Sequence, residues 1–171
     1  MVKFYTESAF KRRTGMNRTE FLLRMLDTTF NKENWYAPLK PAIEGLSAEQ
    51  ASWKPEGAAV KSIWENVNHL IYYKERLAAN LAGREWTRNL DGDETFALTG
   101  QVNDEKVWKA VIERAELAHH SVRKAIIRIT PERLEQNDLE EKLLDIMLHD
   151  AYHTGQIIQL RKMQGTWPSQ R

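Results

Sequence analysis

Apolar residues recur at helical spacing in four segments of this chain. The first two segments follow Asn17 and Ser62, the third follows Asn103 or Asp104, and the fourth begins near Leu139. In each, apolar side chains return every three or four residues, as on one face of an amphipathic helix. The positions concerned are Phe21, Leu22, Met25, Leu26 and Phe30; Ile63, Val67, Leu70, Ile71, Leu77, Ala78 and Leu81; Val107, Val111, Ala115, Ala118, Val122 and Ile126; and Leu143, Ile146, Met147, Ile157 and Leu160. The pattern predicts an all-α fold, for which a four-helix bundle is the simplest arrangement that buries four such faces.

Prolines and a long polar segment interrupt this helical pattern. The first helix is predicted to extend to about Ile43, with a kink or break at Pro38 and Pro41, because proline lacks a backbone donor and crowds the preceding turn. Residues 86–101 separate the second and third helices. We expect this segment to be a long crossover connection, with Trp86 and Phe96 packed against the bundle.

The length and composition fit one globular domain. The chain has 171 residues, of which 42% are hydrophobic and 29% are charged. A chain of this length can bury a core without a disulfide or a structural metal. We therefore expect a single domain over residues 1–171, in which residues 1–16 form an N-terminal arm.

The charge balance and the absence of cysteine exclude several classes of function. Lys and Arg number 25 against 24 Asp and Glu, so the net charge of +1 offers no general field for a nucleic acid. Without cysteine the chain has no disulfide, no thiolate zinc site and no thiol nucleophile of its own. It also lacks a signal-peptide pattern and a run of the ~18 apolar residues that a membrane span needs. We expect a cytoplasmic protein without nucleic-acid or membrane partners.

Three histidines lie at the edges of the predicted apolar faces. His149 and His153 stand four apart in MLHDAYHTGQ, so on a helix they lie one above the other and can bind one ion. His69 occupies a comparable edge position on the second helix. Each histidine alone is compatible with a structural role, whereas the three together predict a site with three imidazole ligands and open coordination positions.

Two other metal motifs are incomplete. Glu116 and His119 have the Glu-x-x-His spacing of di-iron bundles, but no second copy occurs. HDAYH carries Asp150 where the zinc-protease motif HExxH needs its glutamate. We expect His119 and His120 to be solvated on the third helix.

The order and spacing of three segments resemble those of the DinB-like, YfiT-like superfamily of four-helix metalloproteins. These segments are LSAEQASWKP, SIWENVNHLIYYKERL and HDAYHTGQIIQLR, and the resemblance extends over about residues 21–164. It implies a four-helix bundle with a long crossover, often a homodimer, in which His69, His149 and His153 bind a divalent metal. Family members with known activity are similar to thiol transferases that use bacillithiol, mycothiol or glutathione. The prolines of the first helix and the N-terminal arm depart from the family pattern.

The absence of cysteine adds to what this resemblance implies. Three neutral imidazoles leave a divalent ion with its full charge, which favours the reactive thiolate form of a bound thiol. Because the chain has no thiol, a low-molecular-weight thiol must be a cosubstrate. We therefore predict a metal-dependent transferase that joins a bacillithiol-type thiol to an electrophile between the second and fourth helices. Tyr73, Asn66 and Gln156 are candidate pocket groups, and zinc or nickel is the expected metal.

Two alternative functions remain open at this point. A metal-dependent hydrolase would use a metal-bound water, with Asp150 or Glu65 as the candidate general base. A stress-related binding or interaction protein without catalytic activity could instead hold a metal that is structural or vestigial. Both alternatives share the three-histidine site with the transferase.

Overall fold

The computed structural model describes residues 15–57, 59–98, 100–101, 103–136 and 138–169. The longer helices in this part of the chain are α2 (Arg18–Phe30), α5 (Ile63–Leu81), α6 (Glu105–Ile127) and α8 (Leu139–Met163). The shorter ones are α3 (Leu39–Ile43), α4 (Ala48–Ser52), the 3-10 helix η2 (Gly92–Phe96) and α7 (Pro131–Leu134). The described residues contain no strand, so the predicted all-α class is confirmed. None of the helices described is long and apolar enough to cross a bilayer.

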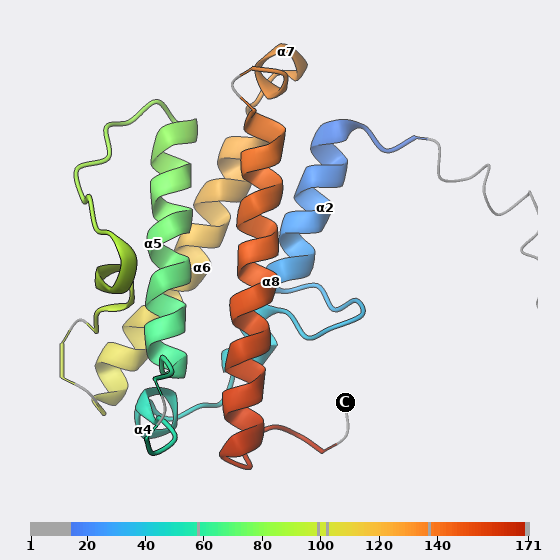
Figure 1. The fold of residues 1–171 in the computed structure, drawn as a ribbon. Helices are drawn as coiled ribbons and strands as arrows, with labels where there is room; N and C mark the ends of the chain where they lie inside the picture. The colour runs from blue at the N-terminus through green and yellow to red at the C-terminus, as the bar shows by residue number, and fades with distance from the viewer. Residues whose placement is uncertain (1–14, 58, 99, 102, 137, 170–171) are drawn as a thin grey trace, which may run out of the picture.

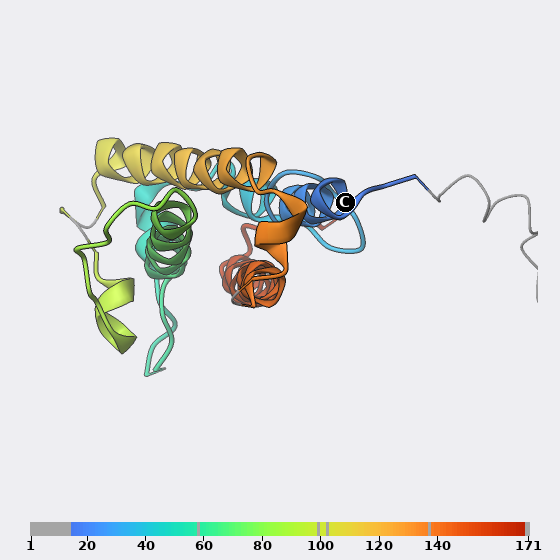
Figure 2. The same ribbon diagram turned by 90° about the horizontal axis from the view of Figure 1, so that it is seen from above.

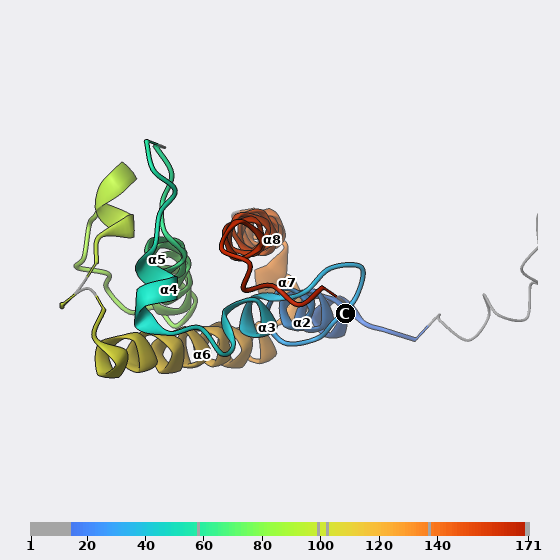
Figure 3. The same ribbon diagram turned by 90° about the horizontal axis from the view of Figure 1, so that it is seen from below.

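The longer helices form two layers, which are seen end-on in Figures 2 and 3. Helices α5 and α8 lie side by side in one layer, and α2 and α6 form the other. Both α5 and α2 contact both α6 and α8, so the four helices surround a shared interior. Helices α5 and α8 run in opposite directions (Figure 1), and η2 packs against α5.

Side-chain caps determine where α2, α5 and α6 begin. Asn17 accepts a hydrogen bond from the backbone N–H of Glu20, and Ser62 accepts one from the backbone N–H of Glu65. In both cases the glutamate side chain accepts from the backbone N–H of the capping residue, which completes a capping box. Of the two residues predicted to cap α6, Asp104 is the cap. The start of α5 is thus fixed close to the residues that surround His69.

The first predicted helix is shorter than expected. Helix α2 ends at Phe30, and Leu39–Ile43 form the separate helix α3. Pro38 is the N-cap of α3 and Pro41 lies in its first turn, where a backbone N–H has no partner within the helix in any case. The prolines are therefore accommodated at the start of a new helix. The expected break is present, but the first helix ends at Phe30, before the chain reaches Pro38.

The buried apolar side chains form two clusters along the bundle. One contains Trp64 and Trp108, and the other contains Ile126 and Leu143. On α5 the first cluster ends at Ile71 and the second begins at Ala78. Polar side chains are buried at the level between the two clusters: Lys74 on α5, His119 on α6 and Asp150 on α8.

Candidate metal centre

The three predicted histidines come together between α5 and α8. His69 extends from α5, and His149 and His153 extend from α8, one helical turn apart. The nitrogen atoms that they offer to an ion all lie within 4.8 Å of one another. Nε2 of His69 lies 2.9 Å from Nε2 of His149. No other group of three or more possible ligands occurs among the described residues.

The imidazole of His69 is oriented by the 3-10 helix η2. Its Nδ1 lies 2.6 Å from Oγ1 of Thr95, whose hydroxyl donates to the carbonyl oxygen of Gly92 at 2.7 Å. Because the hydroxyl hydrogen is used in that bond, Nδ1–H of His69 donates to Thr95 and Nε2 keeps its lone pair. The ring also stacks on Phe96, with centroids 3.8 Å apart. Helix η2 therefore fixes both the tautomer and the plane of this histidine.

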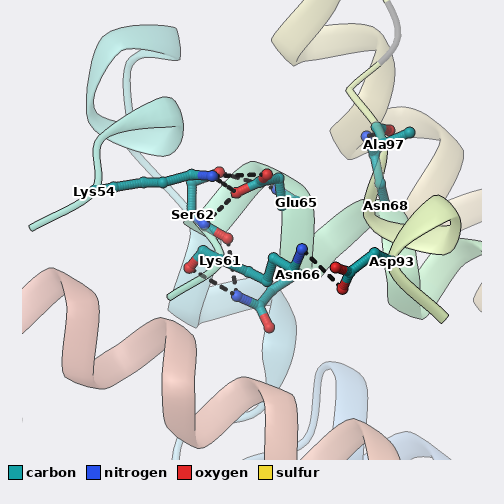
Figure 4. A network of polar contacts seen from close by, with 8 residues as sticks. All are labelled: Lys54, Lys61, Ser62, Glu65, Asn66, Asn68, Asp93 and Ala97. Atoms are coloured by element: carbon teal, nitrogen blue, oxygen red, sulfur yellow. Dashed lines mark hydrogen bonds and ion pairs between the residues drawn. The ribbon is translucent and has the colours of Figure 1, made fainter. Parts of the chain in front are cut away.

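His153 is oriented by side chains on both helices. Its Nδ1 lies 2.8 Å from Oδ1 of Asn66 and 3.0 Å from Oε1 of Gln156. The amide nitrogen of Asn66 donates to the carbonyl oxygens of Ser62 and Lys61, so its carbonyl oxygen points toward α8 (Figure 4). Nδ1–H of His153 is therefore the donor, and its Nε2 is left to bind an ion.

A wider network holds η2 against α5 (Figure 4). The side-chain amide of Asn68 donates to the carbonyl oxygen of Ala97 at 2.8 Å. The ammonium of Lys61 lies 3.0 Å from the carboxylate of Asp93. These contacts lie on both sides of Thr95 in sequence, and they keep its hydroxyl in reach of His69.

The environment of the three histidines keeps them neutral. Burial lowers the pKa of His69 to about 3, and the neighbouring His153, His149 and Lys61 add to the shift. Burial and then His149 lower the pKa of His153 to about 4. Burial and then Lys74 lower the pKa of His149. All three imidazoles are therefore unprotonated at neutral pH, which is the form that binds a metal.

These orientations suit a shared cation. The lone pair of Nε2 on His69 faces Nε2 of His149, and two ring nitrogens this close require a proton or a cation between them. Nδ1 of His149 is buried and has no hydrogen-bond partner. Three neutral imidazoles, two of them held by outer hydrogen bonds, form a donor set that fits a divalent ion with open coordination positions.

The model of the DinB superfamily matches residues 33–157 of the chain, which is well over half of its length. The chain belongs to the DinB superfamily. The match includes His69, His149 and His153, and it extends from before α3 into α8. Comparison with curated proteins and comparison with solved structures each gave no match.

Two cavities flank the histidines of this DinB-superfamily protein. One has a volume of about 510 Å³ and lies beside His149. It is called the charged cavity below, because Arg76, Lys142 and Asp145 line it together with Tyr73. It lies between α5 and α8, where the sequence predicted a cleft.

The second cavity lies beside His153 and has a volume of about 900 Å³. It is called the apolar cavity below, because half of its lining residues are aliphatic, aromatic or methionine; the charged Glu56 and Lys61 also line it. Asn66 and Gln156 reach it from α5 and α8. The apolar lining includes Val60, Phe96, Tyr152, Leu160 and Met163. The three histidines thus lie beside both cavities, with His149 lining the first and His153 lining the second.

The side chains predicted as pocket groups all lie at this centre. Asn66 and Gln156 contact His153. The ring of Tyr73 lies 4.9 Å from that of His69 and 5.1 Å from that of His149, measured between centroids. Sequence reasoning missed Thr95, which lies in a connection without periodicity and gave no signal of its contact with His69.

Both carboxylates considered as general bases are engaged elsewhere. Asp150 is fully buried, and its Oδ2 lies 2.8 Å from Nζ of Lys74. Glu65 accepts from Lys54 at 2.8 Å and from the backbone N–H of Ser62 at 2.6 Å. Neither carboxylate stands beside the histidines as an accessible base, so the hydrolase reading lacks the group that it needs.

The prediction for His119 is wrong. We expected a solvated side chain, but His119 is 0% exposed and stacks on Phe30 with ring centroids 4.2 Å apart. Helix α2 packs against this part of α6 and covers the ring. Its neighbour His120 is exposed, as predicted.

Proposed function

We propose that this DinB-superfamily protein is a metal-dependent thiol transferase. His69, His149 and His153 would hold one divalent ion, zinc or nickel. The reaction would join a low-molecular-weight thiol of the bacillithiol type to an electrophilic substrate. The observation that supports this most directly is the cluster of three neutral imidazoles, oriented by outer hydrogen bonds and placed between two cavities.

The chemistry needs a thiol that the chain does not contain. A divalent ion bound by three neutral ligands keeps its positive charge and favours the anion of a thiol that coordinates it. The protein has no cysteine, so the sulfur comes from a cosubstrate. The reaction forms a bond from this sulfur to the electrophilic carbon, while the leaving group departs and the thiol proton goes to solvent.

The two cavities fit a reaction with two substrates. In the charged cavity, Arg76 and Lys142 suit a carboxylate of the thiol, with His149 at the edge of the cavity. The apolar cavity would accept the uncharged body of the electrophile beside His153. The sulfur and the carbon that it attacks would then meet at the three histidines.

We also propose that the protein acts as a cytoplasmic homodimer. Leu144, Leu148 and Tyr152 are spaced four residues apart on α8, and all three are exposed. This spacing aligns them along one face of the helix, as a helix-to-helix contact between two copies requires. Light scattering coupled to size-exclusion chromatography tests the dimer, and Leu148→Glu should shift the mass toward one chain.

The activity is tested by thiol consumption with one generic electrophile, 1-chloro-2,4-dinitrobenzene, and a panel of thiols. We expect turnover that needs both a divalent metal and an added thiol, and a loss of about 100-fold or more in His69→Ala. The exposed His120→Ala is the matched control and should retain the rate. Equal turnover in His69→Ala, or product formed without added thiol, would overturn the proposal.

A further inference from the structure

A buried ion pair joins α5 to α8 beside the histidines. Nζ of Lys74 lies 2.8 Å from Oδ2 of Asp150. The side chain of Lys74 is 2% exposed and that of Asp150 is 0% exposed. A lysine in the interior is rare unless a charged or polar partner compensates it, and Asp150 is that partner.

The position of the pair relates it to the candidate metal ligands. Lys74 follows His69 by five residues on α5, and Asp150 lies between His149 and His153 on α8. The pair therefore links the helix that carries one ligand to the helix that carries the other two. It lies at the level where the two apolar clusters of the core end.

A third helix also contacts the pair. The hydroxyl of Thr29, on α2, lies 3.0 Å from Oδ2 of Asp150. Nζ of Lys74 lies 5.0 Å from the ring centroid of Phe30, also on α2. Both charged groups are thus held against α2 as well as against each other.

A buried ion pair of this kind need not stabilise the fold. Desolvation of two charges offsets most of their attraction, so a buried ion pair can often be replaced by apolar residues without loss of stability. Two helices that pack through apolar faces, such as that around Leu143 and Met147, can shift along each other and still bury those faces. A buried charge allows no such shift, because it is destabilising without its partner. A slip of one helical turn, about 5.4 Å, would separate Lys74 from Asp150.

We propose that the Lys74–Asp150 pair is a positioning element that fixes the register of α8 against α5, so that His69 meets His149 and His153. Its effect on metal binding rests on the metal site of the proposed function. The pair is closed to solvent and touches no cavity in which a substrate would bind, so it does not contact the reacting atoms. The charge of Lys74 also lowers the pKa of His149, and for this reason the register is measured separately, without metal.

The first test compares metal affinity with stability. Lys74→Met/Asp150→Leu replaces the pair by apolar side chains, and Arg114→Met/Glu75→Leu removes a pair of 2.6 Å contacts between α6 and α5 as the matched control. Co²⁺ is titrated against a chelator, its visible spectrum is recorded, and urea unfolding is measured without metal. We expect the first variant to unfold at a similar or higher urea concentration, yet to bind Co²⁺ at least about 10-fold more weakly with a changed spectrum. The control should bind as the unmodified protein does.

Two results would overturn this inference. One is an unchanged Co²⁺ affinity and spectrum in a folded Lys74→Met/Asp150→Leu variant. If that variant does not fold, Asp150→Asn keeps the shape and removes the charge, and unchanged binding in it is the second such result. Failure of the unmodified protein to bind Co²⁺ would instead reject the proposed function.

A second test measures the register without metal. The chain has no cysteine, so Asn80→Cys on α5 and Lys162→Cys on α8 can be spin-labelled selectively. Both positions are exposed and lie toward opposite ends of the antiparallel pair. In the metal-free protein we expect Lys74→Met/Asp150→Leu, or Asp150→Asn in its place, to shift or broaden the distance distribution from double electron–electron resonance. The Arg114→Met/Glu75→Leu control should match the unmodified protein. A distribution that remains identical in the altered pair would contradict a role in register.

Discussion

Oδ1 of Asn66 accepts a hydrogen bond of 2.8 Å from Nδ1 of His153, and the amide nitrogen of Asn66 is held by the carbonyl oxygens of Ser62 and Lys61. The N-terminal turn of α5 thereby sets the orientation of a ring on α8. Oε1 of Gln156, which is on α8 like His153, lies 3.0 Å from the same Nδ1. The capping box fixes the start of α5. Through Asn66, this start also fixes the direction in which Nε2 of His153 faces an ion.

Replacement of Asn66 by Leu should weaken metal binding by about 10- to 100-fold, because loss of an outer partner frees the orientation of its histidine. Competition with a chelator measures this affinity. Asn80→Leu changes an exposed asparagine of the same helix and is expected to bind metal normally. If Asn66→Leu also bound normally, Gln156 alone would be sufficient to orient His153.

Thr95→Val should have a similar effect through His69. Valine has nearly the shape of threonine but cannot accept from Nδ1–H, so the ring would lose the partner that sets its tautomer. Thr95→Ser keeps the hydroxyl and should bind metal within a few-fold of the unmodified protein. Equal affinities for Val and Ser at this position would show that the stack on Phe96 orients His69 by itself.

His119 gives the fold a defined response to acid. Burial lowers its pKa to about 3, whereas a histidine in an unfolded chain has a pKa of about 6.5. Between these two pKa values the unfolded chain therefore binds a proton that the folded chain does not bind. The free energy of unfolding falls as the pH falls from about 6.5 toward 3. His119→Phe should reduce the slope of unfolding free energy against pH in this window by up to about 1.4 kcal/mol per pH unit. Urea unfolding of metal-free protein across the window measures it, and parallel curves for the two proteins would refute it.

Arg76 should determine preference for a carboxylate on the thiol. Arg76→Gln removes a cation from the charged cavity, so KM for a carboxylate-bearing thiol such as glutathione should rise by about 10-fold with little change in kcat. KM for the uncharged thiol 2-mercaptoethanol should stay the same. Arg128→Gln, at an exposed arginine outside this cavity, is the control. A parallel change with both thiols would assign Arg76 another role.

Much of the fold and the central histidines could be predicted because they depend on local patterns. The apolar spacing and the cap at Ser62 determine α5, and α8 was expected to end at about Gln164 and ends at Met163. His69, His149 and His153 could be grouped because each lies at the edge of an apolar face, and two such edges meet when the helices pack.

The remaining features depend on how distant segments pack. Thr95 reaches His69 from a connection whose path has no periodic signal. The apolar pattern of the sequence gives no sign that Lys74 is buried, since its burial depends on Asp150 of another helix. His119 lies away from the centre of its apolar stripe, and it is buried because Phe30 and Asp27 of α2 pack against it.

Metal content is the most direct test of the central claim. Protein purified without a histidine tag and loaded with Zn²⁺ should bind one ion per chain, and at a free concentration 100 times Kd this should raise the free energy of unfolding by about 2.7 kcal/mol. His69→Ala and His149→Ala should lose both the ion and the stabilisation, whereas His120→Ala should keep both. Unmodified protein that binds no divalent ion, or His69→Ala protein that binds it equally well, would contradict the account.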